Sequence, residues 1–155
     1  MKKEIQKLIP TAVTAVEKYL MTGAEVQKEY DGYAASLGAA IRNSGLIPAL
    51  CFYTDISRTS GDARRWRLLM AIHCTLHKSD LSPDTANDQK ALLDQVIKEV
   101  YGENSFDNEN SNPAQNSQRT TDQSKALSRW NKDILNASIA LKLAMRNFPH
   151  TQNEN

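Results

Sequence analysis

Apolar residues recur every three or four positions along most of the 155-residue chain, which is the spacing of a single helix face. No stretch alternates apolar and polar residues as a half-buried strand would, and no internal repeat is visible. The pattern predicts six helices, at about residues 5–20, 24–43, 48–54, 63–78, 92–100 and 122–148. The length suits one domain with a substantial core. We therefore expect an all-α, single-domain bundle of five to six helices over residues 1–148.

Glycine, proline and short polar residues mark the ends of these predicted helices. Pro10 interrupts the first apolar pattern, so that helix either begins just before it or bends there. Gly45 and Gly102 each follow a helical pattern. We expect Gly45 to cap its helix with a positive φ, which glycine adopts without a side-chain clash. Asp62 and Ser82 precede further helical patterns and are candidate N-terminal caps.

Two segments offer little that a core could bury. Residues 103–118, ENSFDNENSNPAQNSQ, contain five asparagines and very few apolar side chains. Ordering such a segment costs conformational entropy that buried surface does not offset. We expect a flexible surface linker there, and a disordered tail at residues 149–155.

The formal net charge is only +1, which excludes a strong overall field that would attract nucleic acid. The charges are nevertheless arranged in blocks, with 11 basic against 8 acidic side chains in residues 1–80, 2 against 7 in 81–110, and 6 against 2 in 119–148. The N-terminal stretch has an early acid and no long apolar core. No apolar run approaches the roughly 20 residues of a membrane span. We expect a cytoplasmic protein with no membrane partner.

Few residues suit catalysis. His73 and His77 lie four apart on one helix face, but a metal-dependent enzyme also needs a third ligand and a general acid. Cys74 stands where the acid of a metalloprotease helix would be, and it points away from its neighbour His73, which makes a poor nucleophile–base pair. We expect one partly buried and one solvated histidine, and two inert, buried thiols at Cys51 and Cys74. No catalytic residue, metal site or cofactor is predicted.

Basic side chains gather on two of the predicted helices. Three arginines fall in the first turns of the 63–78 helix, at Arg64, Arg65 and Arg67. Cations lose some stability there because the helix dipole makes that end positive, so another use is indicated. Three more cations recur at i, i+4 and i+7 on the solvent face of the last helix, at Lys125, Arg129 and Lys132. Both sets suit contacts with RNA phosphates, although a solvated face with local salt bridges is the simpler explanation for either one.

The junction between the second and third helices, IRNSGLIPAL, is distinctive. A helix–glycine–helix reversal is used by DNA-reading helix-turn-helix proteins, but the helix that follows here, LIPALCFY, offers no polar side chains for base edges. The pattern instead resembles the small subunit of type III-B CRISPR effector complexes, the fifth subunit of the Cmr assembly. The matching residues are Tyr33, Ile41, Arg42, Gly45, Leu46, Ala49, Leu50 and Phe52. The chain length, the helical order and the late helix RWNKDILNASIALKLAM also agree.

The resemblance implies a non-catalytic role in antiviral defence. Small subunits of this family stack along the complex beside the subunits that hold the guide RNA, and they help to position the target RNA while other subunits cleave it. The implied partners are other Cmr subunits, further copies of this chain, and guide and target RNA. Arg42 is the one basic residue that the resemblance carries over, as a candidate for contact either with RNA or with a neighbouring helix.

Two alternatives stay open. An unrelated helical adaptor would bind protein only, and the position of Ile139 and Leu143 off the main apolar stripe of the last helix fits either a protein partner or deep embedding. A small metal- or thiol-dependent enzyme would use His73, Cys74 and His77, and bound metal after purification would support it.

Overall fold

The computed structural model describes residues 2–55, 64–102 and 113–151, and for residues 113–120 it describes the backbone only. The chain is almost entirely helical over these ranges, which confirms the predicted all-α, single-domain class. The helices are α1 (Lys2–Ala15), the π-helix η1 (Val16–Leu20), α2 (Glu29–Ser44), α3 (Leu46–Thr54), α4 (Arg65–His77), α5 (Ala86–Gln89), α6 (Ala91–Tyr101) and α7 (Pro113–Met145). The four-residue α5 is additional to the six helices predicted.

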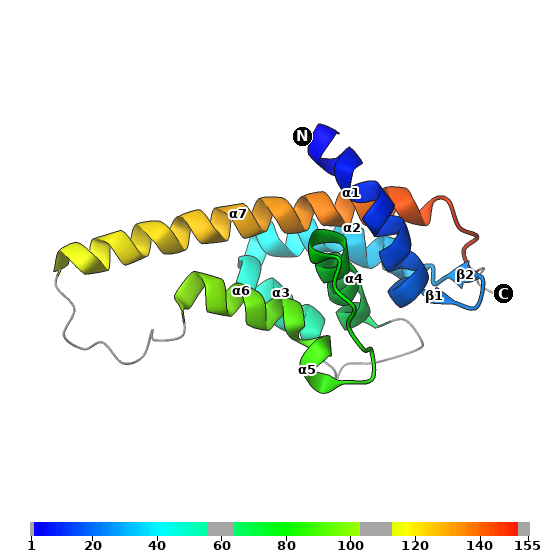
Figure 1. Ribbon diagram of the computed structural model, residues 1–155, viewed down its shortest axis with the longest axis horizontal. Coiled ribbons are helices and arrows are strands. Elements are labelled where there is room, and N and C mark those ends of the chain that lie inside the picture. Colours follow the sequence, from blue (N-terminus) through cyan, green and yellow to red (C-terminus); the bar gives the residue numbers. More distant parts are fainter. Residues whose placement is uncertain (1, 56–63, 103–112, 152–155) are drawn as a thin grey trace.

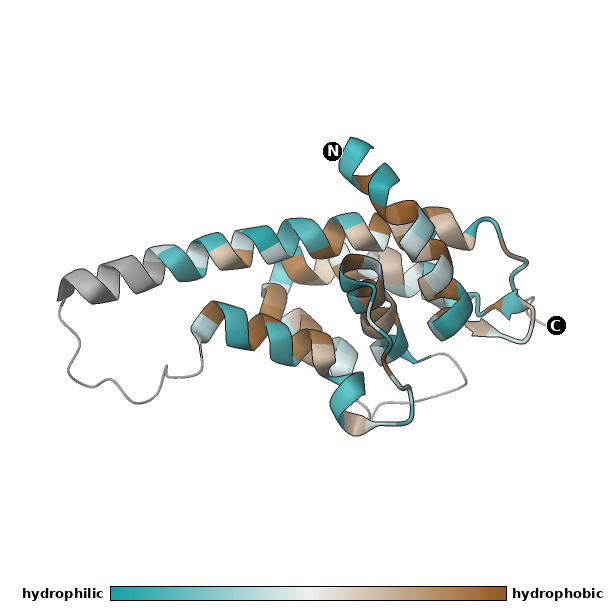
Figure 2. Cartoon of the chain, viewed as in Figure 1, coloured by the Kyte–Doolittle hydropathy of each residue, from teal (hydrophilic) through white to brown (hydrophobic). Residues whose placement is uncertain are grey.

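Helix α7 runs the length of the molecule, and the other long helices pack along it (Figure 1). Helices α1, α2, α4 and α6 all contact α7, and α4 also contacts α1, α2, α3 and α6. Apolar side chains face the space between the helices, while the outer side of α7 is largely hydrophilic (Figure 2). This arrangement leaves α7 with one side in the core and one side open to solvent.

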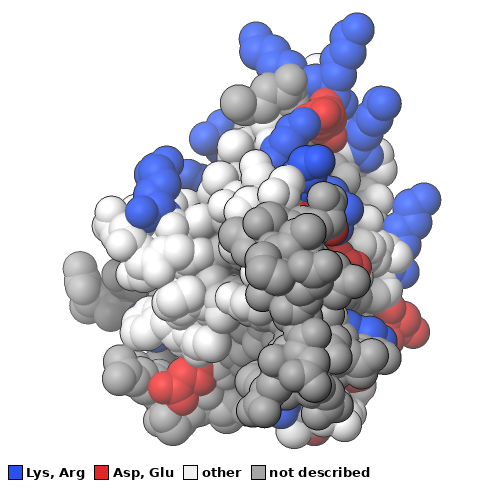
Figure 3. Space-filling model, turned by 90° about the vertical axis from the view of Figure 1, so that its left-hand side faces the viewer, with Lys and Arg blue, Asp and Glu red and all other residues white. Residues whose placement is uncertain are grey.

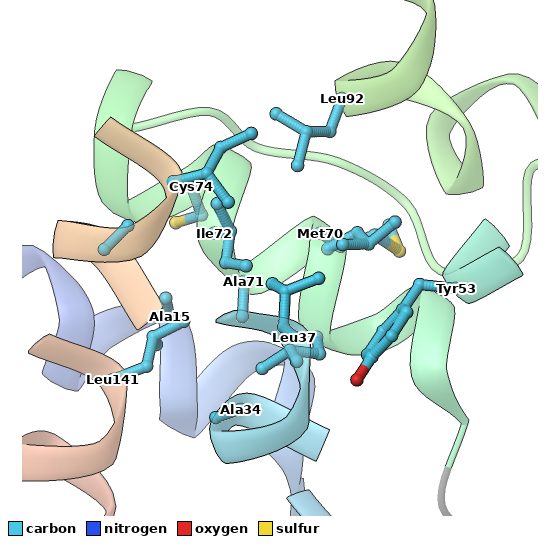
Figure 4. Packing of buried hydrophobic residues seen from close by; sticks show 14 of the residues in the cluster. Ala15, Ala34, Leu37, Tyr53, Met70, Ala71, Ile72, Cys74, Leu92 and Leu141 are labelled. Carbon is cyan, nitrogen blue, oxygen red and sulfur yellow. The ribbon is translucent and has the colours of Figure 1, made fainter. Parts of the chain in front are cut away.

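Helix α4 lies at the centre of the bundle. Five consecutive residues are at most 1% exposed, namely Leu68, Leu69, Met70, Ala71 and Ile72. Figure 4 shows the side chains of Met70 and Ile72 among those of Leu37 from α2, Leu92 from α6 and Leu141 from α7. A helix that is buried on every side carries little amphipathic signal, which explains why its apolar pattern is nearly continuous.

The N-terminal region departs most from the predicted helices. Helix α1 passes through Pro10, and the chain then turns into a two-stranded hairpin, β1 (Met21–Thr22) and β2 (Glu25–Val26), with a positive φ of 64° at Gly23. The predicted absence of strands and the predicted helix start near residue 24 are therefore wrong, because α2 begins at Glu29.

The predicted disordered tail is also wrong for its first residues. The Val26 N–H donates to Pro149 O at 2.8 Å, and the Thr151 N–H donates to Val26 O at 2.9 Å. Residues 149–151 are thus tied to the β1–β2 hairpin, just beyond the end of α7, and residues 152–155 lie outside the described chain. A pairing so distant in sequence leaves no local signal.

The Gly45 junction is built as predicted. Gly45 has a φ of 89°, and its N–H donates to Ile41 O at 2.9 Å, which closes α2. Ile41 and Leu46, on either side of the reversal, are 6% and 4% exposed. Helix α3 begins at Leu46 rather than at Pro48, so the reversal takes a single residue.

The remaining helix ends agree in part with prediction. Gly102 closes α6 with a positive φ of 73°, as predicted. Ser82 is no helix cap, since α5 begins at Ala86, and its N–H instead donates to Asp88 Oδ2 at 2.8 Å. The predicted cap Asp62 lies outside the described residues. Helix α7 begins at Pro113, so the predicted linker is wrong for residues 113–118, and residues 103–112 are outside the described chain.

Candidate nucleic-acid interface

The three predicted cations of the last helix lie on the solvent side of α7. Lys125, Arg129 and Lys132 are all exposed. Arg129 Nη2 lies 3.1 Å from Glu99 Oε2 on α6, and Lys132 Nζ lies 3.1 Å from Glu4 Oε1 on α1. Among the described residues, no carboxylate pairs with Lys125. The stripe therefore exists, and two of its three cations also tie neighbouring helices to α7.

Helix α1 adds two basic side chains beside this stripe. Lys3 and Lys7 are exposed and lie one turn apart on α1, flanking Glu4. The hydrogen bond from Lys132 lowers the pKa of Glu4 below its ordinary value, so this carboxylate stays charged and holds α1 against α7. Sequence reasoning missed these lysines because only the packing of α1 on α7 brings them to the stripe.

Arg42 approaches α7 from its other side. The Ser138 hydroxyl donates to Ala34 O at 3.0 Å, and a Cβ placed at Gly38 would lie 3.3 Å from Leu135 Cδ2. Residue numbers thus rise along α2 as they fall along α7, so the two helices are antiparallel. Arg42, one turn beyond Gly38, is exposed and lies level with the turn of α7 that precedes Leu135.

We group six exposed cations on α7 and on the two helices that flank it, α1 and α2, as the α7 basic face. It consists of Lys3, Lys7, Arg42, Lys125, Arg129 and Lys132. Figure 3 views the molecule from the end where α7 begins, and Lys and Arg side chains gather in the upper part of that view, on the side where α1 begins. The face draws on three helices that are far apart in sequence.

The three arginines at the start of α4 lie elsewhere and are half-buried. The Arg65 guanidinium lies over the rings of Tyr33 and Phe52, with Cζ 4.9 and 5.1 Å from their centroids. Arg67 Nη1 donates to Tyr19 O at 3.0 Å. The opposite end of α4, about 18 Å away, is the one that approaches α7. The structure therefore separates the predicted residues into two groups.

The histidines match their predicted environments. His73 is half-buried, and its Nδ1 and Nε2 lie 2.7 Å from Ser79 Oγ and 2.8 Å from Gln95 Oε1. Burial lowers the pKa of His73 below its ordinary value, which favours the neutral ring. His77 is exposed. No group of three or more His, Cys, Asp or Glu side chains suited to a metal ion occurs within the described ranges.

The two thiols differ from each other. Cys74 is buried, as predicted, and burial raises the pKa of its thiol, which disfavours the reactive thiolate. Cys51 is exposed, and the prediction that it is buried is wrong. It lies on α3, between the buried Leu50 and the exposed Phe52, so the apolar run LIPALCFY does not face the core on every side.

Comparison with known proteins tests the family resemblance found in the sequence. The sequence model of the family described as CRISPR-associated protein (Cas_Cmr5) matches residues 4–142, nearly the whole chain. The chain belongs to the Cas_Cmr5 family. The predicted resemblance is confirmed, and the chain is a small subunit of the multi-subunit Cmr complex of type III-B CRISPR systems. No curated protein and no solved structure gives a significant match.

Within the described residues, no helix combines the length and apolar character needed to cross a membrane.

Proposed function

We propose that this Cmr subunit is non-catalytic, acts in the cytoplasm in antiviral defence, and helps to position the RNA of the effector complex through its α7 basic face. The observation that carries the proposal is that six exposed cations line α7 and its two flanking helices, α1 and α2, in a nearly neutral chain. Only Glu4 and Glu99 form ion pairs with cations of this face among the described residues. Such a surface suits the phosphate backbone, which gives affinity without base recognition.

The non-catalytic role is supported by how the candidate catalytic residues are engaged. Both ring nitrogens of His73 have hydrogen-bond partners, and the pKa of the Cys74 thiol is raised by burial. Neither arrangement favours a nucleophile or an activating base.

Contact with other subunits or with further copies of the chain is supported by exposed apolar side chains. Ile139 on α7 is 41% exposed and lies off the apolar stripe of that helix, which favours a protein partner over deep embedding. Ile97 and Tyr101 on α6 are 38% and 45% exposed. Stacking along the complex would cover such side chains.

The test is target-RNA binding by the reconstituted complex across a range of salt concentrations. Lys7→Gln combined with Lys125→Gln removes two cations of the face that have no carboxylate partner among the described residues, so no acid is left without its cation. The charge-matched control is Lys28→Gln with Lys90→Gln, two exposed lysines outside the face. If Lys7 and Lys125 each contact a phosphate, the double variant should flatten the log–log salt slope by about 1.4.

The control should leave both the affinity and the slope unchanged. Equal affinities and equal slopes for wild type and the Lys7/Lys125 variant would reject the proposed RNA contact. The chain would then act as a protein-only spacer, which is the adaptor alternative.

A further inference from the structure

A second site lies on the opposite end of α4 from the α7 basic face. A pocket of about 450 Å³ opens between the end of η1, strand β1 and the first turn of α4. It is lined by Tyr19, Leu20, Met21, Thr22, Tyr30, Arg64 and Arg67. None of the residues of the α7 basic face lines this pocket.

Three of the side chains that line this pocket, those of Tyr30, Arg64 and Arg67, can donate hydrogen bonds. Arg67 donates one N–H to Tyr19 O at 3.0 Å, which holds its guanidinium in place. Its other N–H groups are available to bind a ligand. Arg64, a half-buried residue, also lines the pocket. Among the described residues, no carboxylate lines the pocket or pairs with either arginine.

Tyr30 supplies a buried donor to the same pocket. The residue is 1% exposed, and its hydroxyl oxygen accepts the Arg64 N–H at 3.3 Å. Its own proton has no acceptor among the described residues, although such a buried donor normally has one. Burial raises the pKa of Tyr30 above its ordinary value, so the hydroxyl keeps that proton near neutral pH. A neutral tyrosine and two guanidiniums therefore line one cavity with donors, and no carboxylate among the described residues lines it.

We infer that this pocket binds a phosphate group. Guanidinium and hydroxyl donors match the several acceptor oxygens of phosphate, and hydrogen bonds between charged partners are the stronger kind. Leu20 and Met21 also line the pocket and would offer apolar contacts to the organic part of a phosphate ester. The group could belong to a free nucleotide or to an RNA backbone, and both present the same chemistry. The inference holds whether or not the α7 basic face contacts RNA.

The experiment is calorimetric titration of the purified chain with pyrophosphate, uridine 5′-monophosphate and a short oligouridylate. Wild type should bind pyrophosphate saturably. Arg64→Gln should raise the dissociation constant about tenfold or more, and Tyr30→Phe, which removes one hydroxyl and keeps the ring, should raise it several-fold. The matched control is Arg146→Gln, an exposed arginine of α7 outside both sites, and it should change nothing.

The ligands distinguish the two sources of phosphate. Binding of the small ligands, with oligouridylate binding unaffected by Arg64→Gln, assigns the pocket to a free nucleotide. Loss of oligouridylate affinity in Arg64→Gln, together with competition by pyrophosphate, assigns it to an RNA phosphate. Absence of saturable pyrophosphate binding by wild type would overturn the inference, as would unchanged affinity in a folded Tyr30→Phe variant.

Discussion

Gly45 joins α2 to α3 in a backbone conformation that other residues rarely adopt. Its φ of 89° and ψ of 164° fall in a region occupied almost only by glycine. A Cβ at this position would meet only Pro48 Cδ, at 3.8 Å, which is ordinary van der Waals contact. Gly45→Ala therefore adds backbone strain without adding a steric clash.

The loss of stability in Gly45→Ala depends on how little the junction can relax. Rotating φ to a negative value would displace Ile41 or Leu46, which are 6% and 4% exposed and belong to the core. The strain should therefore persist and lower the free energy of unfolding by about 1–3 kcal/mol. For a chain of this size that corresponds to a melting temperature lower by roughly 2–12 °C. Gly45→Val should cost at least as much, because a β-branched residue tolerates positive φ poorly.

The assay is urea unfolding followed by far-UV circular dichroism, with Gly32→Ala as the matched control. Gly32 lies inside α2, has open space around its would-be Cβ and no positive φ. The same substitution there should stabilise the helix by about 0.5–1 kcal/mol. Opposite signs at the two glycines, with unchanged m-values, are the expected result. A Gly45→Ala variant as stable as wild type would refute the reasoning about this junction.

Three further outcomes are expected. One thiol, Cys51, should react with a thiol reagent in the native protein and a second, Cys74, only after unfolding; two native thiols would contradict the burial of Cys74. Because the pKa of His73 is lowered on folding, the unfolded chain binds protons more readily, so the free energy of unfolding should fall as the pH drops from about 7 to 5. His73→Asn should make that fall less steep in urea titrations, and an identical pH profile would reject this role. Ser138→Ala removes the buried bond to Ala34 O and should cost about 0.5–1.5 kcal/mol in the same urea assay; a neutral result would show that α2 and α7 do not depend on it.

The fold class could be predicted because helical periodicity is local. The stripe of Leu127, Trp130 and Ile134 identified α7, and the glycine at position 45 identified the reversal before α3. The hairpin could not be predicted, since strands of two residues have no room for alternation. Its strand β2 also pairs through Val26 with Pro149 and Thr151, which lie near the other end of the chain.

The candidate interface could be predicted only one helix at a time. The spacing of Lys125, Arg129 and Lys132 correctly placed them on the solvent face of α7. Their neighbours Lys3 and Lys7 depend on the crossing of α1 over α7, which periodicity does not encode. The three arginines at the start of α4 were predicted from their position as candidates for RNA contact, but they are half-buried. The half-buried position of its arginines reflects contacts with the aromatic rings and carbonyl of other helices, and no cation spacing predicts those.

The ion pairs on the α7 basic face would compete only weakly with the proposed RNA contact. Arg129 and Lys132 are 63% and 60% exposed in their side chains, and ion pairs at such exposed positions contribute little to stability. A phosphate can therefore replace Glu99 or Glu4 as a partner at little cost. Until then the two carboxylates restrict where these long side chains lie. Under the proposed function, a local salt bridge and an RNA contact would be successive uses of the same cations. Lysines that have no carboxylate partner among the described residues are therefore the ones that separate the two explanations.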